Sequence, residues 1–155
     1  MITIETKPIR STAVTVPGSK SYTHRLLIAA ALSNGTCQIH NILRSEDTRL
    51  TLGALKQMGA AVIDSGDTVE LTGLNGKFRP CDEPIYLANS GTSMRLLTGL
   101  CALGQGTYSL TGTQRMGERP IGDLLDSLTQ MGIRAVSVNQ NNCPPVQVTA
   151  GTVTT

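Results

Sequence analysis

The chain has 155 residues, of which 39% are hydrophobic and 15% are charged, and this is enough for one compact domain with its own core. Its formal net charge of +2 argues against intrinsic disorder and against a broad nucleic-acid footprint. With no tryptophan, one phenylalanine and three tyrosines, it also lacks the aromatic side chains on which bases stack.

The first half of the chain is predicted to form a strand, a helix, a strand, a second helix and two further strands. Alternating residues at 12–16 indicate the first strand, and the apolar segment after it indicates a helix at about 22–32. Leu52, Leu55 and Met58 recur every three residues in a second helix, which we expect Asp47 to cap. The other strands are predicted at 36–40, 61–64 and 69–72, with a hairpin turn between the last two.

The second half is predicted to follow the same order. A strand at 85–87 leads into a helix at about 91–103, and another strand follows at 107–111. Two last strands end near residue 149. Before them, a second helix is indicated by apolar residues that share one helical face: Ile121, Leu124, Leu125, Leu128 and Met131.

The two halves also repeat each other in sequence. Arg25-Leu26-Leu27 returns as Arg95-Leu96-Leu97, and Gln57-Met58-Gly59 returns as Gln130-Met131-Gly132, so the offset drifts only from 70 to 73 residues. Matches in the same order at nearly one offset indicate an internal duplication. We therefore predict an α/β fold of repeated strand-helix-strand-helix-strand-strand units within one domain, 1–155. The two units are predicted at about 12–74 and 84–150.

The first strand-to-helix turn is suited to binding an anion. Gly18 frees the backbone and Ser19 can cap the helix, so exposed amides and the helix dipole favour negative charge there. Lys20 and Ser21 add a cation and a hydroxyl, and Arg25 lies one turn further along the same face. An ordinary capped helix with solvated charges explains this segment alone equally well. The segment is not a Walker A loop, because no glycine precedes the lysine at the required distance.

The second unit has the same device in the equivalent place. Asn89 or Ser90 can cap the helix, Gly91 allows a ligand close to the backbone, and Arg95 stands where the first unit has its arginine. Because the device occurs twice, and because nine of the thirteen basic residues are arginines, we favour sites for small anions over two merely structural caps.

A third group of charged residues lies at 114–120, before the last long helix. Arg115 repeats Arg44 at an offset of 71 residues, within the range of the other matches. Glu118 and Arg119 could pair with each other at the surface, so this segment alone carries little weight.

The remaining chemistry-bearing residues indicate no further site. His24 and His40 have no partner at metal or triad spacing, so we expect a solvated or capping role for each. The sequence has no apolar leader and no apolar stretch long enough for a bilayer, and we predict a soluble, cytoplasmic chain without a metal or membrane site. The cysteines form no CxxC pair and no disulfide framework, and none lies beside a histidine or in a basic cluster: Cys37, Cys81, Cys101 and Cys143.

Three motifs, in this order, closely resemble the N-terminal part of the 5-enolpyruvylshikimate-3-phosphate (EPSP) synthase family, the 3-phosphoshikimate 1-carboxyvinyltransferases. They are PGSKSxxxR at 17–25, NSGTxMR at 89–95 and RMxERP at 115–120. In that family a unit of strands and helices repeats several times in two lobes. The resemblance implies an enolpyruvyl transferase-like lobe with two units present and further units missing, so that the chain is an N-terminal fragment or a split piece.

The resemblance also implies a reaction and its site residues. The enolpyruvyl group of phosphoenolpyruvate would pass to the 5-hydroxyl of shikimate 3-phosphate, with release of phosphate and with no cofactor or metal. Lys20, Ser21 and Arg25 would hold shikimate 3-phosphate, with the lysine also reaching phosphoenolpyruvate as a catalytic residue. Gly91 and Arg115 would bind phosphoenolpyruvate. The same helix mouth would be supported by Asn89 and Arg95.

Two departures from the family pattern bear on these expectations. Ser90 and Leu96 stand where the best-known bacterial members have alanine and proline, so glyphosate is expected only as a possible inhibitor. The chain is also much shorter than the family's enzymes, and we expect it to need the remaining C-terminal part as a partner and to be inactive alone.

Three other interpretations remain open at this stage. One is an enzyme like the transferase that acts on UDP-N-acetylglucosamine, although that enzyme uses a cysteine which nothing here clearly supplies. Another is a non-catalytic repeat domain that binds anions. The last is an enzyme that processes RNA phosphates on a similar repeat fold, which the charge and the lack of aromatic residues disfavour.

Overall fold

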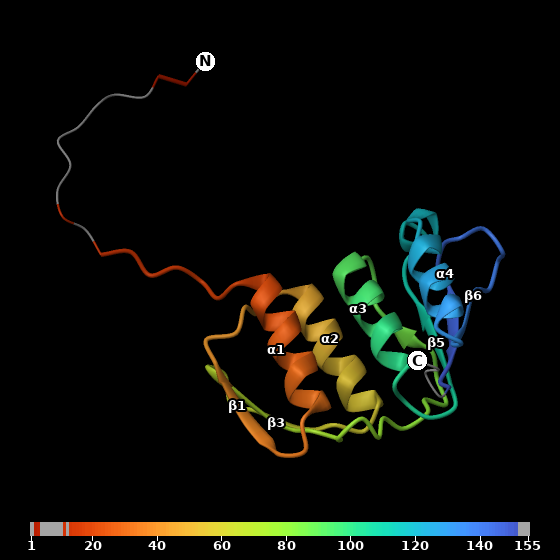
Figure 1. Ribbon diagram of the computed structural model, residues 1–155. Coiled ribbons are helices and arrows are strands. Elements are labelled where there is room, and N and C mark those ends of the chain that lie inside the picture. The colour runs from red at the N-terminus through yellow and green to blue at the C-terminus, as the bar shows by residue number, and fades with distance from the viewer. Residues whose placement is uncertain (1, 4–10, 12, 152–155) are drawn as a thin grey trace.

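The computed structural model describes residues 2–3, 11 and 13–151, and Figure 1 shows the arrangement of its elements. The helices are α1 (Lys20–Leu32), α2 (Glu46–Gln57), α3 (Gly91–Cys101), α4 (Gly122–Gln130) and a short 3₁₀ helix η1 (Met116–Glu118). The strands are β1 (Thr36–His40), β2 (Ala61–Asp64), β3 (Thr68–Thr72), β4 (Ile85–Tyr86), β5 (Thr107–Thr111), β6 (Arg134–Ser137) and β7 (Val146–Thr149).

The strands form two sheets that share one strand order. In the first sheet the order is β1-β3-β2, and both pairs are antiparallel. In the second it is β4-β5-β7-β6, where β5, β7 and β6 correspond to β1, β3 and β2, and where β4 is added parallel to β5. Figure 1 shows α1 and α2 beside the first sheet and α3 and α4 beside the second, so each half has the same layers.

The strand predicted at 12–16 is the main difference from the sequence analysis. Thr12 lies outside the described residues, and residues 13–16 have no regular secondary structure. A strand needs a neighbour for its backbone hydrogen bonds, and β4, the equivalent segment, obtains one from β5. No described strand pairs with residues 13–16, and Figure 1 shows this red-orange segment leading away from β1.

The helix boundaries differ from the predicted ones for local reasons. Helix α1 begins at Lys20 because the Ser19 hydroxyl accepts a hydrogen bond from the Tyr22 amide at 3.4 Å. The expectation that Asp47 caps α2 is wrong. The cap is Ser45, which exchanges side-chain-to-backbone hydrogen bonds with Thr48 at 3.0 and 3.3 Å. Asp47 lies instead in the first turn, where its charge is favourable to the helix dipole.

The two halves share one continuous apolar core. Helix α2 contacts α1 on one side and α3 on the other, so the helices form a row across the molecule. Tyr108 of β5 is fully buried, and its hydroxyl donates to the carbonyl oxygen of Phe78, in the segment that joins the halves, at 2.9 Å. Within the described residues, no helix combines the length and the apolar character that crossing a membrane requires.

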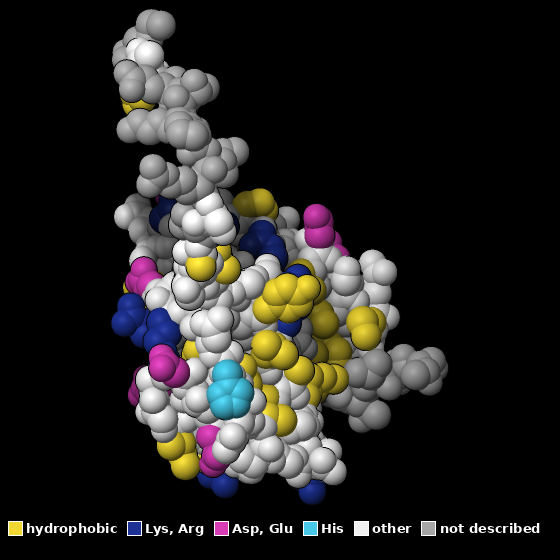
Figure 2. All heavy atoms as spheres, turned by 90° about the vertical axis from the view of Figure 1, so that its left-hand side faces the viewer, with side chains coloured by type: hydrophobic (Ala, Val, Ile, Leu, Met, Phe, Trp, Pro, Cys, Tyr) yellow, Lys and Arg dark blue, Asp and Glu magenta, His cyan; other side chains and the backbone are white. Residues whose placement is uncertain are grey.

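The surface around α1 carries exposed apolar side chains. Figure 2 looks at the side of Figure 1 on which α1 lies and shows hydrophobic side chains gathered there. Tyr22 and Leu26, one turn apart on α1, are 71% and 48% exposed. The helix thus buries one face against the core and presents an apolar strip on the other, next to its charged first turn.

Candidate functional site

The first residue of α1 is held by an ion pair with the neighbouring helix. The Lys20 ammonium lies 3.0 Å from a carboxylate oxygen of Asp47, and the two side chains are 51% and 28% exposed. A surface pair of this kind contributes at most about 1 kcal/mol to stability. Its main effect is to hold the ammonium between the first turns of α1 and α2. Sequence reasoning missed this role for Asp47, because nothing in the sequence links two residues 27 positions apart.

The other predicted residues on α1, Ser21 and Arg25, lie one turn apart on its exposed side. Ser21 and Arg25 are both exposed, and an Arg25 guanidinium nitrogen donates to the Ser21 carbonyl oxygen at 3.0 Å. No carboxylate within the described part of the chain pairs with Arg25. The structure therefore joins Arg25 to Ser21, one turn apart on α1, and leaves Arg25 exposed. Lys20 lies next to Ser21 in the first turn, but its ammonium bonds to Asp47.

The second helix mouth, at the start of α3, follows a constrained turn. Ser90 is the cap residue, as one of the two sequence alternatives proposed, and its hydroxyl accepts from the Ser93 amide at 3.4 Å. Ala88 has a φ of 43°, in the left-handed region that is unfavourable for alanine. The Thr113 amide donates to the Ala88 carbonyl oxygen at 2.9 Å and so helps to hold this turn against the segment after β5.

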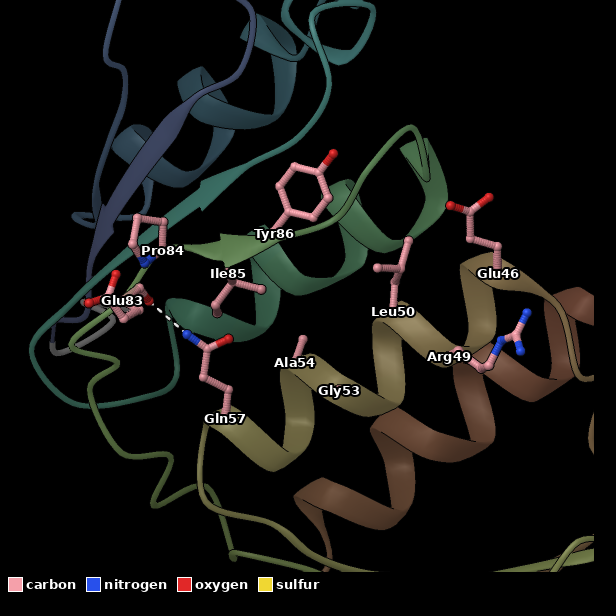
Figure 3. Close-up of a pocket in the computed structure, with 10 residues that line it drawn as sticks. All are labelled: Glu46, Arg49, Leu50, Gly53, Ala54, Gln57, Glu83, Pro84, Ile85 and Tyr86. Atoms are coloured by element: carbon pink, nitrogen blue, oxygen red, sulfur yellow. Dashed lines mark hydrogen bonds between the residues drawn. The ribbon is translucent and has the colours of Figure 1, made fainter.

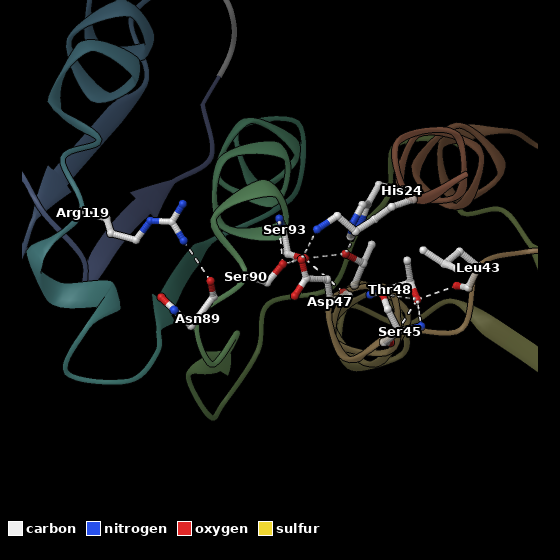
Figure 4. Close-up of polar contacts among 11 residues, drawn as sticks. His24, Leu43, Ser45, Asp47, Thr48, Asn89, Ser90, Ser93 and Arg119 are labelled. Atoms are coloured by element: carbon white, nitrogen blue, oxygen red, sulfur yellow. Dashed lines mark hydrogen bonds and ion pairs between the residues drawn. The ribbon is translucent and has the colours of Figure 1, made fainter. Parts of the chain in front are cut away.

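Gly91, the first residue of α3, lies directly against Arg119. A Cβ atom on Gly91 would lie 2.5 Å from a terminal nitrogen of that guanidinium and 2.6 Å from its carbon. The same guanidinium donates to the Asn89 carbonyl oxygen at 2.9 Å (Figure 4). The structure thus gives a reason for glycine at 91 that the sequence did not reveal: the space of a side chain is taken by Arg119.

The charged pairs around η1 differ from the interpretation made from the sequence. The pairing of Glu118 with Arg119 is wrong, because Glu118 instead lies 2.5 Å from Arg115, three residues earlier. The helix geometry of η1 places those two side chains on one side. Arg115 is 73% exposed, and among the described residues its guanidinium forms no hydrogen bond or ion pair with α1 or α3. It is the predicted site residue that the structure leaves apart from the others.

Arg95 forms a second link between α3 and the same segment. Its guanidinium donates to the Pro120 carbonyl oxygen at 2.7 Å and to the Gly91 carbonyl oxygen at 3.4 Å. Arg119 bonds in the opposite direction, from the segment to the turn before α3. The two arginines therefore join the turn that carries Gly91 to the loop that carries Arg115.

His24 lies beneath the mouth of α1, and its expected solvated or capping role is wrong. The imidazole is fully buried, its Nδ1 lies 2.9 Å from the Thr51 hydroxyl, and its Nε2 has no partner within the described residues. Burial lowers the pKa of His24, and the positive charges of Lys20 and Arg25 also lower it, while Asp47 opposes them. The imidazole is therefore neutral near pH 7. His40, by contrast, is exposed and bonds to the Thr68 hydroxyl at 2.9 Å.

A cavity with a different character lies between α2 and the segment that ends in β4. It has a volume of about 790 Å³ and is lined by apolar residues such as Leu50 and Ile85, with Arg49 as its one cation (Figure 3). Gln57 donates to the Glu83 carbonyl oxygen at 2.7 Å at one end. None of the predicted site residues lines this groove. An anion has more suitable partners at the two helix mouths, and the described residues contain no cluster of metal ligands.

Comparison with known proteins agrees with the resemblance. The sequence matches the family model described as EPSP synthase (3-phosphoshikimate 1-carboxyvinyltransferase) over residues 5–155. A relative from Burkholderia ambifaria, named 3-phosphoshikimate 1-carboxyvinyltransferase, is 41% identical over 143 residues, which cover 92% of this chain and 33% of the relative. The chain thus spans about a third of the length of this curated relative.

Solved structures support the same fold. The structure is similar to EPSP synthase from Acinetobacter baumannii, with a TM-score of 0.84 and 31% identity over 89% of this chain and 32% of the other. The enolpyruvyl transferase NikO from Streptomyces tendae is 16% identical with a TM-score of 0.52, over 84% of this chain and 29% of the other, and shares the fold alone. The predicted α/β fold class of enolpyruvyl transferase type is confirmed.

Proposed function

Because this chain belongs to the EPSP synthase family, we propose that it supplies part of the active site of a 3-phosphoshikimate 1-carboxyvinyltransferase. The reaction transfers the enolpyruvyl group of phosphoenolpyruvate to the 5-hydroxyl of shikimate 3-phosphate and releases phosphate. The observation that carries the proposal is the cationic first turn of α1, where Asp47 holds Lys20 beside an Arg25 whose guanidinium faces solvent. A helix N-terminus with adjacent cations is suited to a small dianion.

Shikimate 3-phosphate is assigned to Lys20, Ser21 and Arg25. These three exposed side chains lie in the first two turns of α1 and offer an ammonium, a hydroxyl and a guanidinium. The guanidinium uses one nitrogen on the Ser21 carbonyl oxygen, so its other N–H groups can donate to a phosphate in a forked arrangement.

Phosphoenolpyruvate is assigned to Lys20, Gly91 and Arg115, with Asn89 and Arg95 as supporting residues. The ion pair between Arg115 and Glu118 is exposed and contributes at most about 1 kcal/mol, so a doubly charged substrate can replace the carboxylate at little cost. The links of Arg95 and Arg119 across the loop are compatible with Arg115 moving toward Gly91 as it does so.

The proposed chemistry is an addition followed by an elimination. The 5-hydroxyl gives up its proton as its oxygen bonds to C2 of phosphoenolpyruvate and C3 gains a proton, and the tetrahedral adduct then loses phosphate and a C3 proton. Lys20 is assigned a catalytic role as the cation that touches both substrates. In the described residues Asp47 is paired with Lys20 and His24 is buried, so we assign the proton transfers to groups outside these 155 residues. The proposal includes no cofactor and no metal.

The active unit is proposed to combine this chain with the further sequence that its relatives have. That remaining C-terminal part would cover the apolar strip of Tyr22 and Leu26 on α1, and the 155 residues alone would be inactive. The repeats at about 12–74 and 84–150, glyphosate as an inhibitor and a cytoplasmic location belong to the same proposal. A reducing compartment suits four cysteines that are all free.

The test is the replacement Lys20→Ala, with Lys56→Ala as the matched control. Lys56 is an exposed lysine near the end of α2 and makes no ion pair within the described residues. Loss of a charge-assisted contact of about 2–3 kcal/mol weakens the binding of shikimate 3-phosphate by roughly 30- to 150-fold. Calorimetric titration measures this loss of binding, and phosphate release by the complete enzyme measures turnover. Normal turnover in a folded Lys20→Ala protein would remove the assignment.

A further inference from the structure

Four buried side chains form a hydrogen-bonded cluster that crosses three helices, beneath the N-termini of α1 and α3. The distances are 2.9 Å from His24 Nδ1 to Thr51 Oγ1, 2.8 Å from Thr51 Oγ1 to Ser93 Oγ and 2.7 Å from Ser93 Oγ to Ser90 Oγ. His24, Thr51 and Ser93 are 0% exposed and Ser90 is 1% exposed. We call these four residues the interhelix polar cluster, and Figure 4 shows His24, Ser90 and Ser93 among them, between α1 and α3.

The cluster lies one helical turn below the ion pair at the surface. His24 follows Lys20 by one turn on α1, and Thr51 follows Asp47 by one turn on α2. The exposed pair and the buried pair therefore join the same two helices at successive levels. The Ser93 hydroxyl extends this link to α3, because it also donates to the Asp47 carbonyl oxygen at 3.2 Å.

The number of hydroxyl protons determines which atom donates in each hydrogen bond of the cluster. Each hydroxyl has one proton, and the Ser93 proton goes to the Asp47 carbonyl oxygen. The Thr51 and Ser90 hydroxyls then donate to Ser93, so Thr51 must accept a proton from Nδ1 of His24. This arrangement places a proton on Nδ1 of His24. Because burial lowers the pKa of His24, the ring is neutral near pH 7, and Nε2, which has no partner within the described residues, carries no proton.

Other buried threonines bond only within their own segment or to an adjacent loop. Thr98 of α3 donates to the Met94 carbonyl oxygen one turn back, and Thr23 of α1 donates to the Ser19 carbonyl oxygen and accepts from the Leu43 amide. Thr51 differs because its hydroxyl joins side chains of two other helices. Thr51 thus connects the α3 cap to the imidazole under Lys20.

We propose that His24 and Thr51 are positioning residues that fix the N-terminus of α3, at Gly91, relative to the N-terminus of α1, at Lys20. This inference rests on the proposed function, in which phosphoenolpyruvate touches both mouths and shikimate 3-phosphate touches α1. A shift of α3 relative to α1 then disturbs one substrate and spares the other. A cluster that only stabilised the core would have no such preference.

The test compares Thr51→Val with Thr98→Val, since both remove a buried hydroxyl and keep the shape of the side chain. In the complete enzyme, Thr51→Val raises the KM of phosphoenolpyruvate by about tenfold, a change of about 1.4 kcal/mol, and leaves that of shikimate 3-phosphate within about twofold. Thr98→Val changes neither KM, although both variants lower the Tm. Thr51→Ser retains the hydroxyl and restores the wild-type KM. Equal changes in both KM values, or no difference between the two valine variants, would overturn the proposal.

A second readout does not depend on the reaction. Nitrogen NMR of the folded 155-residue chain reports the His24 tautomer and the Gly91 amide. The cluster is supported if the wild type is protonated at Nδ1, and if Thr51→Val loses this tautomer and shifts the Gly91 amide while Thr98→Val does neither. This result would support the cluster even if no turnover is found. Protonation at Nε2 in the wild type, or an unmoved Gly91 amide in Thr51→Val, refutes it. Absence of turnover with the NMR result intact would count against the proposed function alone.

Discussion

The contact between Gly91 and Arg119 predicts the cost of placing a methyl group at position 91. In Gly91→Ala the new Cβ would lie 2.5 Å from the guanidinium nitrogen, whereas ordinary contact begins at 3.4 Å. The guanidinium must therefore retreat by about 0.9 Å, which breaks its 2.9 Å hydrogen bond to the Asn89 carbonyl oxygen. Such a bond from a charged donor is worth about 1.5–3 kcal/mol, and because Arg119 is only half-buried we expect a loss of about 1 kcal/mol. For a chain of this size that lowers the Tm by roughly 2–4 °C.

A double-mutant cycle tests whether Arg119 causes this loss. Thermal unfolding is measured for Gly91→Ala, Arg119→Ala and the double variant, with Gly99→Ala as the control. Gly99 lies in the same helix with open space around it, so an alanine there should raise stability through helix propensity. We expect the methyl group to cost little once Arg119 is gone. An equal loss in both backgrounds would refute the reasoning. In that case the new methyl group would clash with the backbone and not with Arg119. If stability is unchanged and only the KM of phosphoenolpyruvate rises, the methyl group would instead clash with the proposed ligand.

Two further predictions concern titration and thiol reactivity. The pKa of His24 is lowered in the folded state from 6.5, so the unfolded chain binds the additional proton first, and the free energy of unfolding should fall as the pH drops below 6.5. Chemical denaturation at several pH values should show this slope in the wild type and a flatter one in His24→Gln; equal slopes would contradict it. Burial raises the pKa values of the Cys81 and Cys101 thiols, which makes them less reactive. We therefore expect an alkylating reagent to modify Cys37 and Cys143 first, and the fully buried Cys101 only on unfolding. Mass spectrometry would follow the order of modification. Early modification of Cys101 would contradict its burial.

Local signals in the sequence predicted most elements of the fold. The hairpin of β2 and β3 follows from apolar alternation around Ser65-Gly66-Asp67, and the cap of α3 follows from Ser90. Residues 13–16 carry an equally good strand pattern and yet form no strand. A sequence pattern gives only a preference for extended backbone, and a β-strand also needs a neighbouring strand to hydrogen-bond with.

The candidate site was predictable in part for a similar reason. Lys20, Ser21 and Arg25 lie within two turns of one helix, so helical spacing alone brings them together. The contacts of Asp47 with Lys20 and of Arg119 with Gly91 join different elements, and they depend on how the helices pack. Charge type at Glu118 suggested a partner, but the choice between Arg115 and Arg119 was made by the geometry of η1. His24 gave no signal of burial, because its partner Thr51 comes from another helix and Thr51 in turn bonds to Ser93 at the start of a third.

The shared core has a consequence for how the two repeats could be separated. Tyr108 of the second half is anchored to the Phe78 carbonyl oxygen in the joining segment, and helices α2 and α3 pack against each other across the boundary. Cutting the chain between the repeats would expose a buried phenol, strip the partner from a carbonyl group and uncover apolar faces on both sides. Because each half covers apolar surface of the other, we expect the two halves to unfold together in one cooperative transition.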